Sequence, residues 1–165
     1  IPDRLVQKIK AAAKFNQGFE TTEYLASALI DLHLHTSDPT DIDPVRFEQE
    51  VLAALNMPSE LVMRHRTPHF GHIFSGEGYA AGYYSYVWAD VLTSDAAEAF
   101  AETPDGLYDQ ETAGRLKEFL FNPQNSIDPV EAYRLFRGRD AQVGALMRDR
   151  GFPSVSKLTS PSELN

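Results

Sequence analysis

The sequence predicts an all-α fold, an irregular helical bundle. Apolar residues recur every three to four positions along most of the chain. The strict alternation typical of a half-buried strand is nearly absent, and cap and breaker residues separate the periodic stretches. Of the 165 residues, 42% are hydrophobic, so the chain can bury a real core. We expect a main body over residues 1–152 and a polar tail over residues 153–165.

The first two helices are predicted at residues 4–15 and 22–35. In the first, "RLVQKIKAAAKF", Leu5 and Ile9 share one face with two alanines, and lysines occupy the other face. In the second, "TEYLASALIDLHLH", three leucines repeat at i, i+4 and i+7. The turn-forming stretch "TSDPTDIDP" then ends the helical pattern.

A third helix is predicted at residues 45–55, because Asp43 can cap it and Pro44 suits its first position. Between Met57 and Gly78 the periodicity weakens, and proline and glycines interrupt the chain. We expect an irregular segment there, with a short extended piece near residues 64–76.

Three more helices are predicted after the turn "TPDGLYD". Residues 110–121 carry acids in their first turn, which suits a helix N-terminus. The next helix begins with the capping box "DPVE", headed by Asp128, and ends at Gly138. The last helix covers residues 141–150 and stops at a glycine.

The segment "SGEGYAAGYYSYVWAD" places four tyrosines and a tryptophan close together. If a helix starts near Tyr79 and runs to about Phe100, Tyr79, Tyr83 and Tyr86 fall within an arc of about 60°. A separate apolar packing face is expected on the opposite side of this helix, made of Ala81, Tyr84, Trp88, Val91 and Leu92.

Two interpretations of this tyrosine stripe remain open. Phenols are directional O–H donors that suit an oxyanion or a peptide carbonyl, and the glycines upstream would let a loop approach a ligand. Alternatively, the rings half-bury at a helix interface and form local hydrogen bonds.

The charge pattern argues against nucleic acid as a partner. The formal net charge is −9, whereas phosphate binding needs a clustered basic face. A mild concentration of arginines between Arg134 and Arg150 is interleaved with acids, which favours a solvated surface. No apolar run approaches the ~18 residues needed to cross a bilayer, so we expect no membrane partner.

All five histidines lie in the first half of the chain, and His65, His69 and His72 crowd into "HRTPHFGH". His65 and His69 have the i, i+4 spacing of helical zinc ligands, but Pro68 makes a helix there unfavourable. No His-Glu pair occurs anywhere, so the H-E-x-x-H helix of many metallopeptidases is absent. We therefore expect no metal ligands within this chain. With zero cysteines, the chain also lacks thiolate ligands and thiol nucleophiles.

The stretch "MRHRTPHFGHIFSGEGYAAGYYSYVWADVL" closely resembles the C-terminal part of the thimet oligopeptidase family, and most of all its bacterial peptidyl-dipeptidase (dipeptidyl carboxypeptidase) branch. The likeness extends upstream through "KIKAAAKFNQGFETTEYLASALIDLHLH" and downstream through "EAYRLFRGRDAQVGALMRDRGF", to about Phe152. One departure is "FNPQNSIDP", where relatives often carry a glycine-bearing turn before the cap.

The resemblance implies a fold and an activity for a larger parent protein. Members of the family are largely helical, two-lobed zinc metallopeptidases that cleave short peptides, and their zinc ligands lie in an H-E-x-x-H helix upstream of the matching region. The chain would then be a C-terminal fragment that carries part of the substrate-channel wall, is inactive alone, and binds no zinc itself. Its expected partners are short peptides and the remainder of the same enzyme, with self-association of the fragment and a cytoplasmic location as further expectations.

The resemblance also assigns roles to individual residues. His72, Tyr79 and Tyr86 match a histidine and tyrosines that hydrogen-bond the peptide and stabilise the tetrahedral intermediate, and Tyr83 is a weaker match for peptide contact. The expected function is therefore that of a peptidyl-dipeptidase or oligopeptidase. The alternative is a stand-alone, non-catalytic helical module that holds peptides on its tyrosine face.

Overall fold

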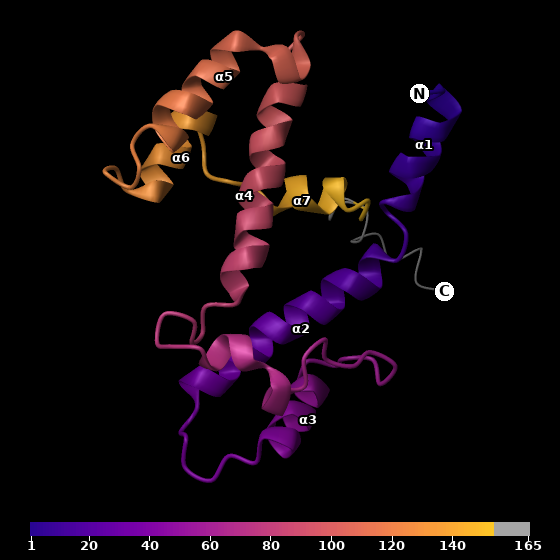
Figure 1. Cartoon of the computed structure of the whole chain (residues 1–165), viewed down its shortest axis with the longest axis vertical. Helices are drawn as coiled ribbons and strands as arrows, with labels where there is room; N and C mark the ends of the chain where they lie inside the picture. The colour runs from indigo at the N-terminus through magenta and orange to yellow at the C-terminus, as the bar shows by residue number, and fades with distance from the viewer. Residues whose placement is uncertain (154–165) are drawn as a thin grey trace, which may run out of the picture. The chain divides into compact units, whose positions relative to one another are not determined.

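The computed structural model describes residues 1–153, which are helical with no strand among them, as predicted (Figure 1). The chain divides into two compact units, Ile1–Trp88 and the residues from Ala89 onward. Apart from its first residue, the predicted polar tail lies outside the described residues. No helix within the described part of the chain is both long and apolar enough to span a membrane.

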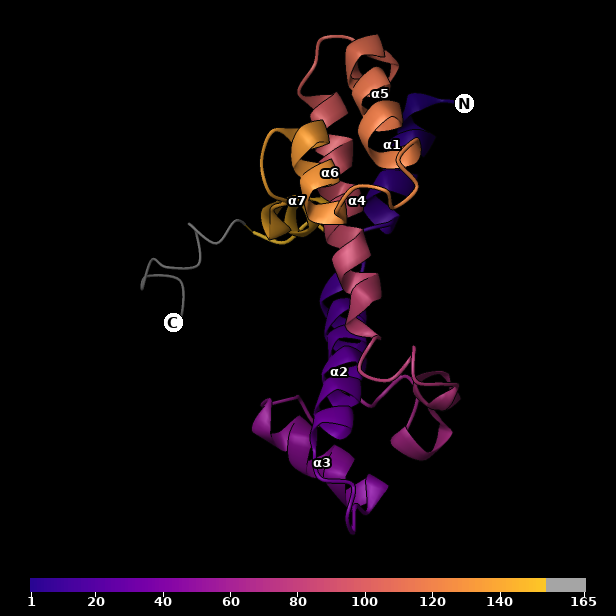
Figure 2. The same cartoon turned by 90° about the vertical axis from the view of Figure 1, so that its left-hand side faces the viewer.

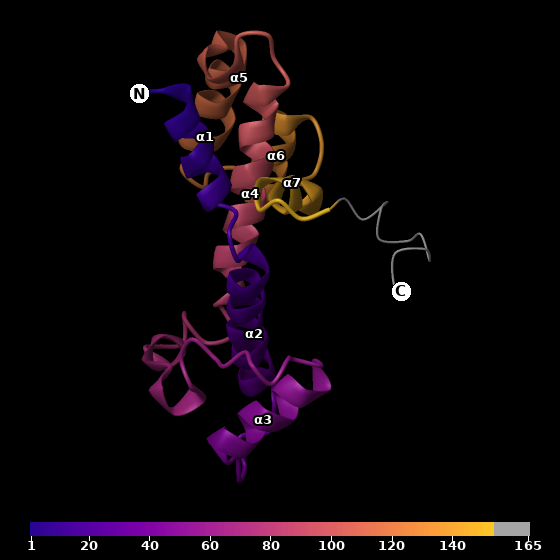
Figure 3. The ribbon, with the colours of Figure 1, turned by 90° about the vertical axis from the view of Figure 1, so that its right-hand side faces the viewer.

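The first unit is built around one long helix. Its helical elements are α1 (Asp3–Ala12), α2 (Gln17–Thr36), α3 (Pro44–Ala54), the 3₁₀ turns η1 (Thr67–His69) and η2 (Gly71–Phe74), and the start of α4 (Tyr84–Ala101). α2 packs against α3, and the segment with η1 and η2 lies beside the C-terminal half of α2 (Figures 1 and 3). The unit's core joins these pieces through Ile30 of α2 and Phe70 and Ile73 of the 3₁₀ segment.

The structure confirms the predicted start of the third helix and shifts the boundaries of the first two. The Asp43 side chain accepts hydrogen bonds from two backbone N–H groups of the first turn of α3. α2 begins at Gln17, five residues earlier than predicted, because Asn16 in the left-handed region separates it from α1 (φ 61°). The predicted apolar face of α1 is exposed, including Leu5 and Ile9.

The extended piece predicted near residues 64–76 is wrong, since the chain forms η1 and η2 there. Pro68 stands in the first turn of η1, where its fixed φ suits helical backbone. The buried Glu48 carboxylate accepts the backbone N–H of Thr67 at 2.7 Å and its hydroxyl at 2.8 Å. Turns of three or four residues are too short to produce a periodic apolar pattern.

The tyrosine helix also starts later than predicted, at Tyr84 instead of Tyr79. A turn covers the preceding residues, and Ala81 adopts a φ of 56°, which a right-handed helix does not permit. The helical wheel counted from Tyr79 is therefore wrong, and so is part of its packing face: Tyr84 and Trp88 are exposed, while Val91 is buried.

The second unit contains the rest of α4 and the helices that follow it (Figure 2). These elements are η3 (Gly106–Tyr108), α5 (Gln110–Leu116), the π-helix η4 (Lys117–Phe121), α6 (Pro129–Arg137) and α7 (Val143–Asp149). α6 packs against α5 and η4. Its predicted ends are confirmed, since the Asp128 carboxylate caps the first turn and Gly138 closes the helix with a φ of 76°.

The arginine-rich stretch is solvated only in part: Arg134 and Arg148 are exposed, whereas Arg137 and Arg150 are largely buried. Four of its arginines pair with acids of α4 or of the residue after it at N–O distances of 2.6–2.8 Å: Arg137 with Glu102, Arg139 with Asp95, Arg148 with Glu98, and Arg150 with Asp90. The Arg137 side chain is only 8% exposed. These charges hold the second unit together.

Candidate functional site

The site residues expected from the sequence lie together in the first unit, around the imidazole of His72. From the centroid of that ring, the ring centroids of Tyr79, Tyr83 and Tyr86 lie 5.0, 5.5 and 5.8 Å away. The Tyr86 hydroxyl is 3.4 Å from Nε2 of His72. We call these four residues the His72 cluster.

Three kinds of backbone supply the cluster. His72 lies in η2, Tyr79 and Tyr83 lie in the turn before α4, and Tyr86 lies in the first turn of α4. A Cβ on Gly82 would lie 3.3 Å from the carbonyl oxygen of Tyr79, so the backbone of the turn passes close to itself at this position. The tyrosines thus meet through a tight turn, although the sequence predicted that a helical stripe would align them.

Tyr83 is the anchor of the cluster. Its ring packs edge-on against Phe70 of the core at 4.9 Å and against Tyr24 of α2 at 5.6 Å. Burial raises the pKa of the Tyr83 phenol, which keeps it in its protonated, hydrogen-bond-donating form. Tyr79 and Tyr86 are more open, with 48% and 46% of their surface exposed, and remain available to a ligand.

A hollow of about 320 Å³ opens beside the cluster. Its lining residues are Tyr24, Arg64, His65, Phe70, His72, Tyr83 and Tyr86. The Arg64 guanidinium lies 5.5 Å from the centroid of the Tyr24 ring, and its Nε donates to Glu23 at 3.1 Å. This volume lies in the lower part of the range of small-ligand pockets, and polar groups converge on it.

Sequence reasoning missed Asp31, a fully buried residue of α2. Its Oδ1 accepts the backbone N–H of Ala81 at 3.0 Å, and its Oδ2 accepts that of Tyr83 at 2.8 Å. Nδ1 of His35, one turn further along α2, lies 2.8 Å from Oδ1. The available signal was an aspartate inside the apolar stretch "ALIDLHL", four residues before a histidine.

The histidines do not converge on a metal. Across residues 1–153 there is no group of three histidine or acidic side chains placed to hold an ion. The donor set in this part of the chain therefore does not fit a zinc site.

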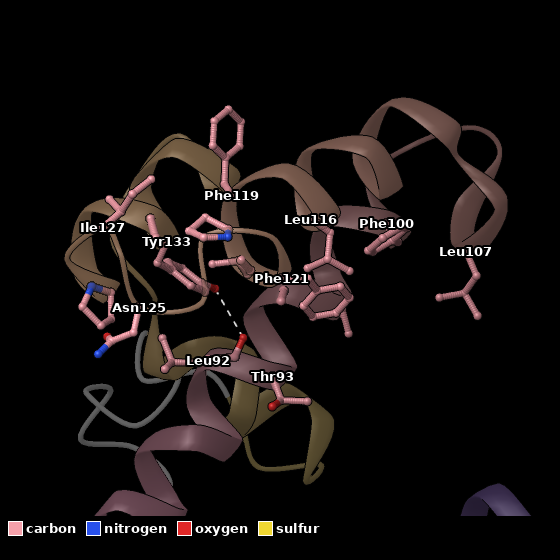
Figure 4. A pocket seen from close by; sticks show the side chains of 16 residues that line it. Leu92, Thr93, Phe100, Leu107, Leu116, Phe119, Phe121, Asn125, Ile127 and Tyr133 are labelled. Carbon is pink, nitrogen blue, oxygen red and sulfur yellow. Dashed lines mark hydrogen bonds between the residues drawn. The ribbon is translucent and has the colours of Figure 1, made fainter.

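The second unit contains a larger hollow of about 620 Å³ (Figure 4). Leucine, phenylalanine and alanine side chains dominate its lining, and the Tyr133 hydroxyl donates to the carbonyl of Leu92 at 3.3 Å. No acid, base or cation lines this hollow, and the Tyr133 hydroxyl is already bonded to Asp95 at 2.7 Å.

Comparisons with known proteins show which family this chain resembles in sequence. The family model described as "Peptidase family M3" matches residues 1–152 of the chain. The chain is 36% identical to the dipeptidyl carboxypeptidase of Escherichia coli K12 over 154 residues and 33% identical to oligopeptidase A of the same organism over 157 residues. It is also 33% identical to a probable cytosolic oligopeptidase A of Arabidopsis thaliana over 162 residues. The matches cover 92–94% of this chain and 22–23% of the relatives' length.

Proposed function

The chain belongs to peptidase family M3, and on this premise we propose that it supplies the substrate-handling donors of a zinc-dependent peptidyl-dipeptidase or oligopeptidase. The observation that carries the proposal is the His72 cluster, where two half-exposed tyrosines, Tyr79 and Tyr86, lie against the imidazole. Short peptides are the proposed substrates, because the related enzymes are named as peptidases of that kind.

The chemistry assigned to the cluster is hydrogen-bond donation to a carbonyl under attack. Negative charge develops on the carbonyl oxygen when the scissile bond is attacked, and preorganised donors stabilise that charge most. A phenol has one hydrogen to donate. In the tautomer that carries its hydrogen on Nε2, His72 can donate to the phenol oxygen of Tyr86, which leaves the phenol hydrogen free for the substrate carbonyl.

Tyr79 and Tyr83 complete the set. Tyr79 packs edge-on against His72 from the turn, so its hydroxyl can reach the same substrate group or an adjacent peptide carbonyl. Tyr83 is more buried and lines the hollow, where it can contact a substrate side chain or backbone. We propose Tyr86, Tyr79 and His72 as catalytic residues and Tyr83 as a substrate-binding residue.

Zinc has no site among the described residues, and the whole sequence contains no H-E-x-x-H. We assign none of this chain's residues to the metal. The chain covers about a fifth of the length of its bacterial relatives. The proposal is that a further polypeptide part of the same enzyme holds the metal and that this chain forms the wall facing it.

Replacing Tyr86 by phenylalanine tests the catalytic assignment. In a polypeptide that carries the H-E-x-x-H part ahead of this chain, Tyr86→Phe should lower kcat about 100- to 1000-fold with little change in KM. Tyr84→Phe is the matched control, since Tyr84 is exposed and has no ring contact with His72. An unchanged kcat for Tyr86→Phe would overturn the assignment.

Zinc content and hydrolysis of a blocked fluorogenic peptide distinguish the proposal from the binding-module alternative. The 165-residue chain alone should neither hold stoichiometric zinc nor cleave the peptide, and the longer polypeptide should do both. Peptide binding without hydrolysis in both proteins would favour a non-catalytic module. Stoichiometric zinc in the short chain would show that its histidines form a metal site.

A further inference from the structure

We propose that Asp31 is a positioning residue, whose buried carboxylate fixes the turn that carries Tyr79 and Tyr83 beside His72. The inference deepens the proposed function, and it rests on that function for its catalytic consequence. Its structural part stands on the contacts of the Asp31 carboxylate alone.

Both oxygens of the Asp31 carboxylate are used. Oδ1 accepts the N–H of Ala81 and faces Nδ1 of His35, and Oδ2 accepts the N–H of Tyr83. The side chain is fully buried, and a buried carboxylate is stable only when such partners surround it. One carboxylate therefore links α2 to two alternate peptide units of the turn.

The turn needs this support because its backbone is unfavourable. Ala81 has a φ of 56°, in the left-handed region that residues with a Cβ rarely occupy. A residue persists there only when its surroundings fix it. The bond from the Ala81 N–H to Asp31 supplies that constraint at the strained residue itself.

One bond lies between the two tyrosines that the turn supplies, at Ala81, and the other is at Tyr83 itself. A looser turn would shift Tyr79, which is half-exposed and has its ring contact with His72. The core of the unit, which includes Ile30, Phe70 and Ile73, is held by apolar contacts, and Tyr83 packs against it through its ring. Because the ring of Tyr83 keeps this packing, loss of Asp31 should move Tyr79 most.

Asp31→Asn is the sharpest variant. It keeps the size of the side chain but replaces one acceptor oxygen by an N–H₂ donor, which must face a backbone N–H whichever way the amide is turned. Asp38→Asn is the matched control, since the Asp38 carboxylate also accepts a backbone N–H, that of Thr40 at 2.9 Å, within an exposed loop.

Amide hydrogen exchange of the 165-residue chain tests the structural step without any activity. The amides of Ala81 and Tyr83 should exchange about 10- to 100-fold faster in Asp31→Asn, as expected for lost bonds to a charged acceptor, and at unchanged rates in Asp38→Asn. His35→Ala removes the third partner of Asp31, together with a ring contact to Phe74, and leaves both carboxylate acceptors of the backbone N–H groups in place, so it should give a smaller increase. If Asp31→Asn does not fold, the amide exchange rates of His35→Ala test the inference instead. Unchanged rates at Ala81 and Tyr83 would overturn the inference.

Kinetics of the longer, H-E-x-x-H-bearing polypeptide test the positioning step. Asp31→Asn should lower kcat about 100-fold, as for a misplaced catalytic group, while KM changes little. The double variant Asp31→Asn/Tyr79→Phe should be no slower than the slower single variant, because Asp31 acts through Tyr79. Losses that multiply would refute positioning through Tyr79.

The two sets of outcomes are separable. If Tyr79→Phe and Tyr86→Phe both leave kcat unchanged, the proposed function fails, and exchange at Ala81 and Tyr83 still decides whether Asp31 fixes the turn. The other result is that both tyrosine variants lower kcat while Asp31→Asn keeps the amide exchange rates and the kcat of the parent. In that case the proposed function stands and the inference about Asp31 is wrong.

Discussion

Asp95→Asn should strongly destabilise the second unit. The Asp95 carboxylate is fully buried and accepts two hydrogen bonds from Arg139, at 2.7 and 3.0 Å, and one from the hydroxyl of Tyr133 at 2.7 Å. Arg137 lies 3.5 Å from it. The variant would leave two guanidinium groups beside a neutral amide that can accept at only one atom.

The expected loss in the free energy of unfolding is about 3 kcal/mol. Removing one partner of a buried ion pair costs about 3–5 kcal/mol. We take the lower end because the Arg139 side chain is 32% exposed and can regain water. For a unit of this size each kcal/mol lowers Tm by roughly 4–8 °C, so Tm should fall by about 12 °C or more.

Urea unfolding followed by far-UV circular dichroism measures this loss. Glu98→Gln is the matched control, because the Glu98–Arg148 pair has the same bidentate geometry but lies near solvent, so its removal should cost under about 1 kcal/mol. A loss below about 1 kcal/mol for Asp95→Asn, or equal losses for both variants, would refute the argument that burial makes the Asp95 network essential.

Two further predictions concern the backbone and pH. Gly138→Ala should lower the free energy of unfolding by about 1 kcal/mol, because only the φ of 76° opposes it and no atom lies within 4 Å of the added Cβ. Gly114 lies inside α5 with equally open space, so Gly114→Ala should instead raise the free energy of unfolding by up to about 1 kcal/mol. Urea unfolding of both variants measures the contrast, and equal effects would contradict it. Burial raises the pKa of the Asp95 carboxyl, but hydrogen bonds from Arg139 and Tyr133 outweigh it and leave the pKa below its usual range. The unfolded chain then binds more protons in acid, so this stabilisation is present above about pH 4 and is lost as the pH falls through the folded-state pKa. Tm should therefore fall more steeply below pH 4 in the parent than in Asp95→Asn, and parallel curves would contradict the linkage.

The parts of the fold that the sequence predicts well are those governed by local chemistry. Asp43 and Asp128 cap helices through their own side chains, and Gly138 ends one through its own backbone, so neighbouring residues suffice to place them. The start of α4 at Tyr84 escaped prediction because a carboxylate 50 residues away in sequence stabilises Ala81 in a left-handed conformation. Helical periodicity contains no information about such a partner.

The candidate site was likewise predictable only where residue type or resemblance was sufficient. His72, Tyr79 and Tyr86 could be singled out by residue type and by resemblance, and the structure brings them together through a turn instead of a helical stripe. The residues that hold this arrangement, Asp31 and Glu48, could not be found in the same way. Asp31 had only the weak signal of its apolar surroundings and Glu48 had none, and the tertiary contacts of both carboxylates reveal their role.

The pairing of the α4 acids with distant arginines also affects the order in which the second unit can form. Its four principal ion pairs join residues 35–60 positions apart in sequence. Until the arginines arrive, α4 carries the unpaired acids Asp90, Asp95 and Glu98, and Glu102 follows directly after its end. During synthesis α4 therefore emerges well before its counter-charges, and the network of the unit can close only after Arg150 has left the ribosome.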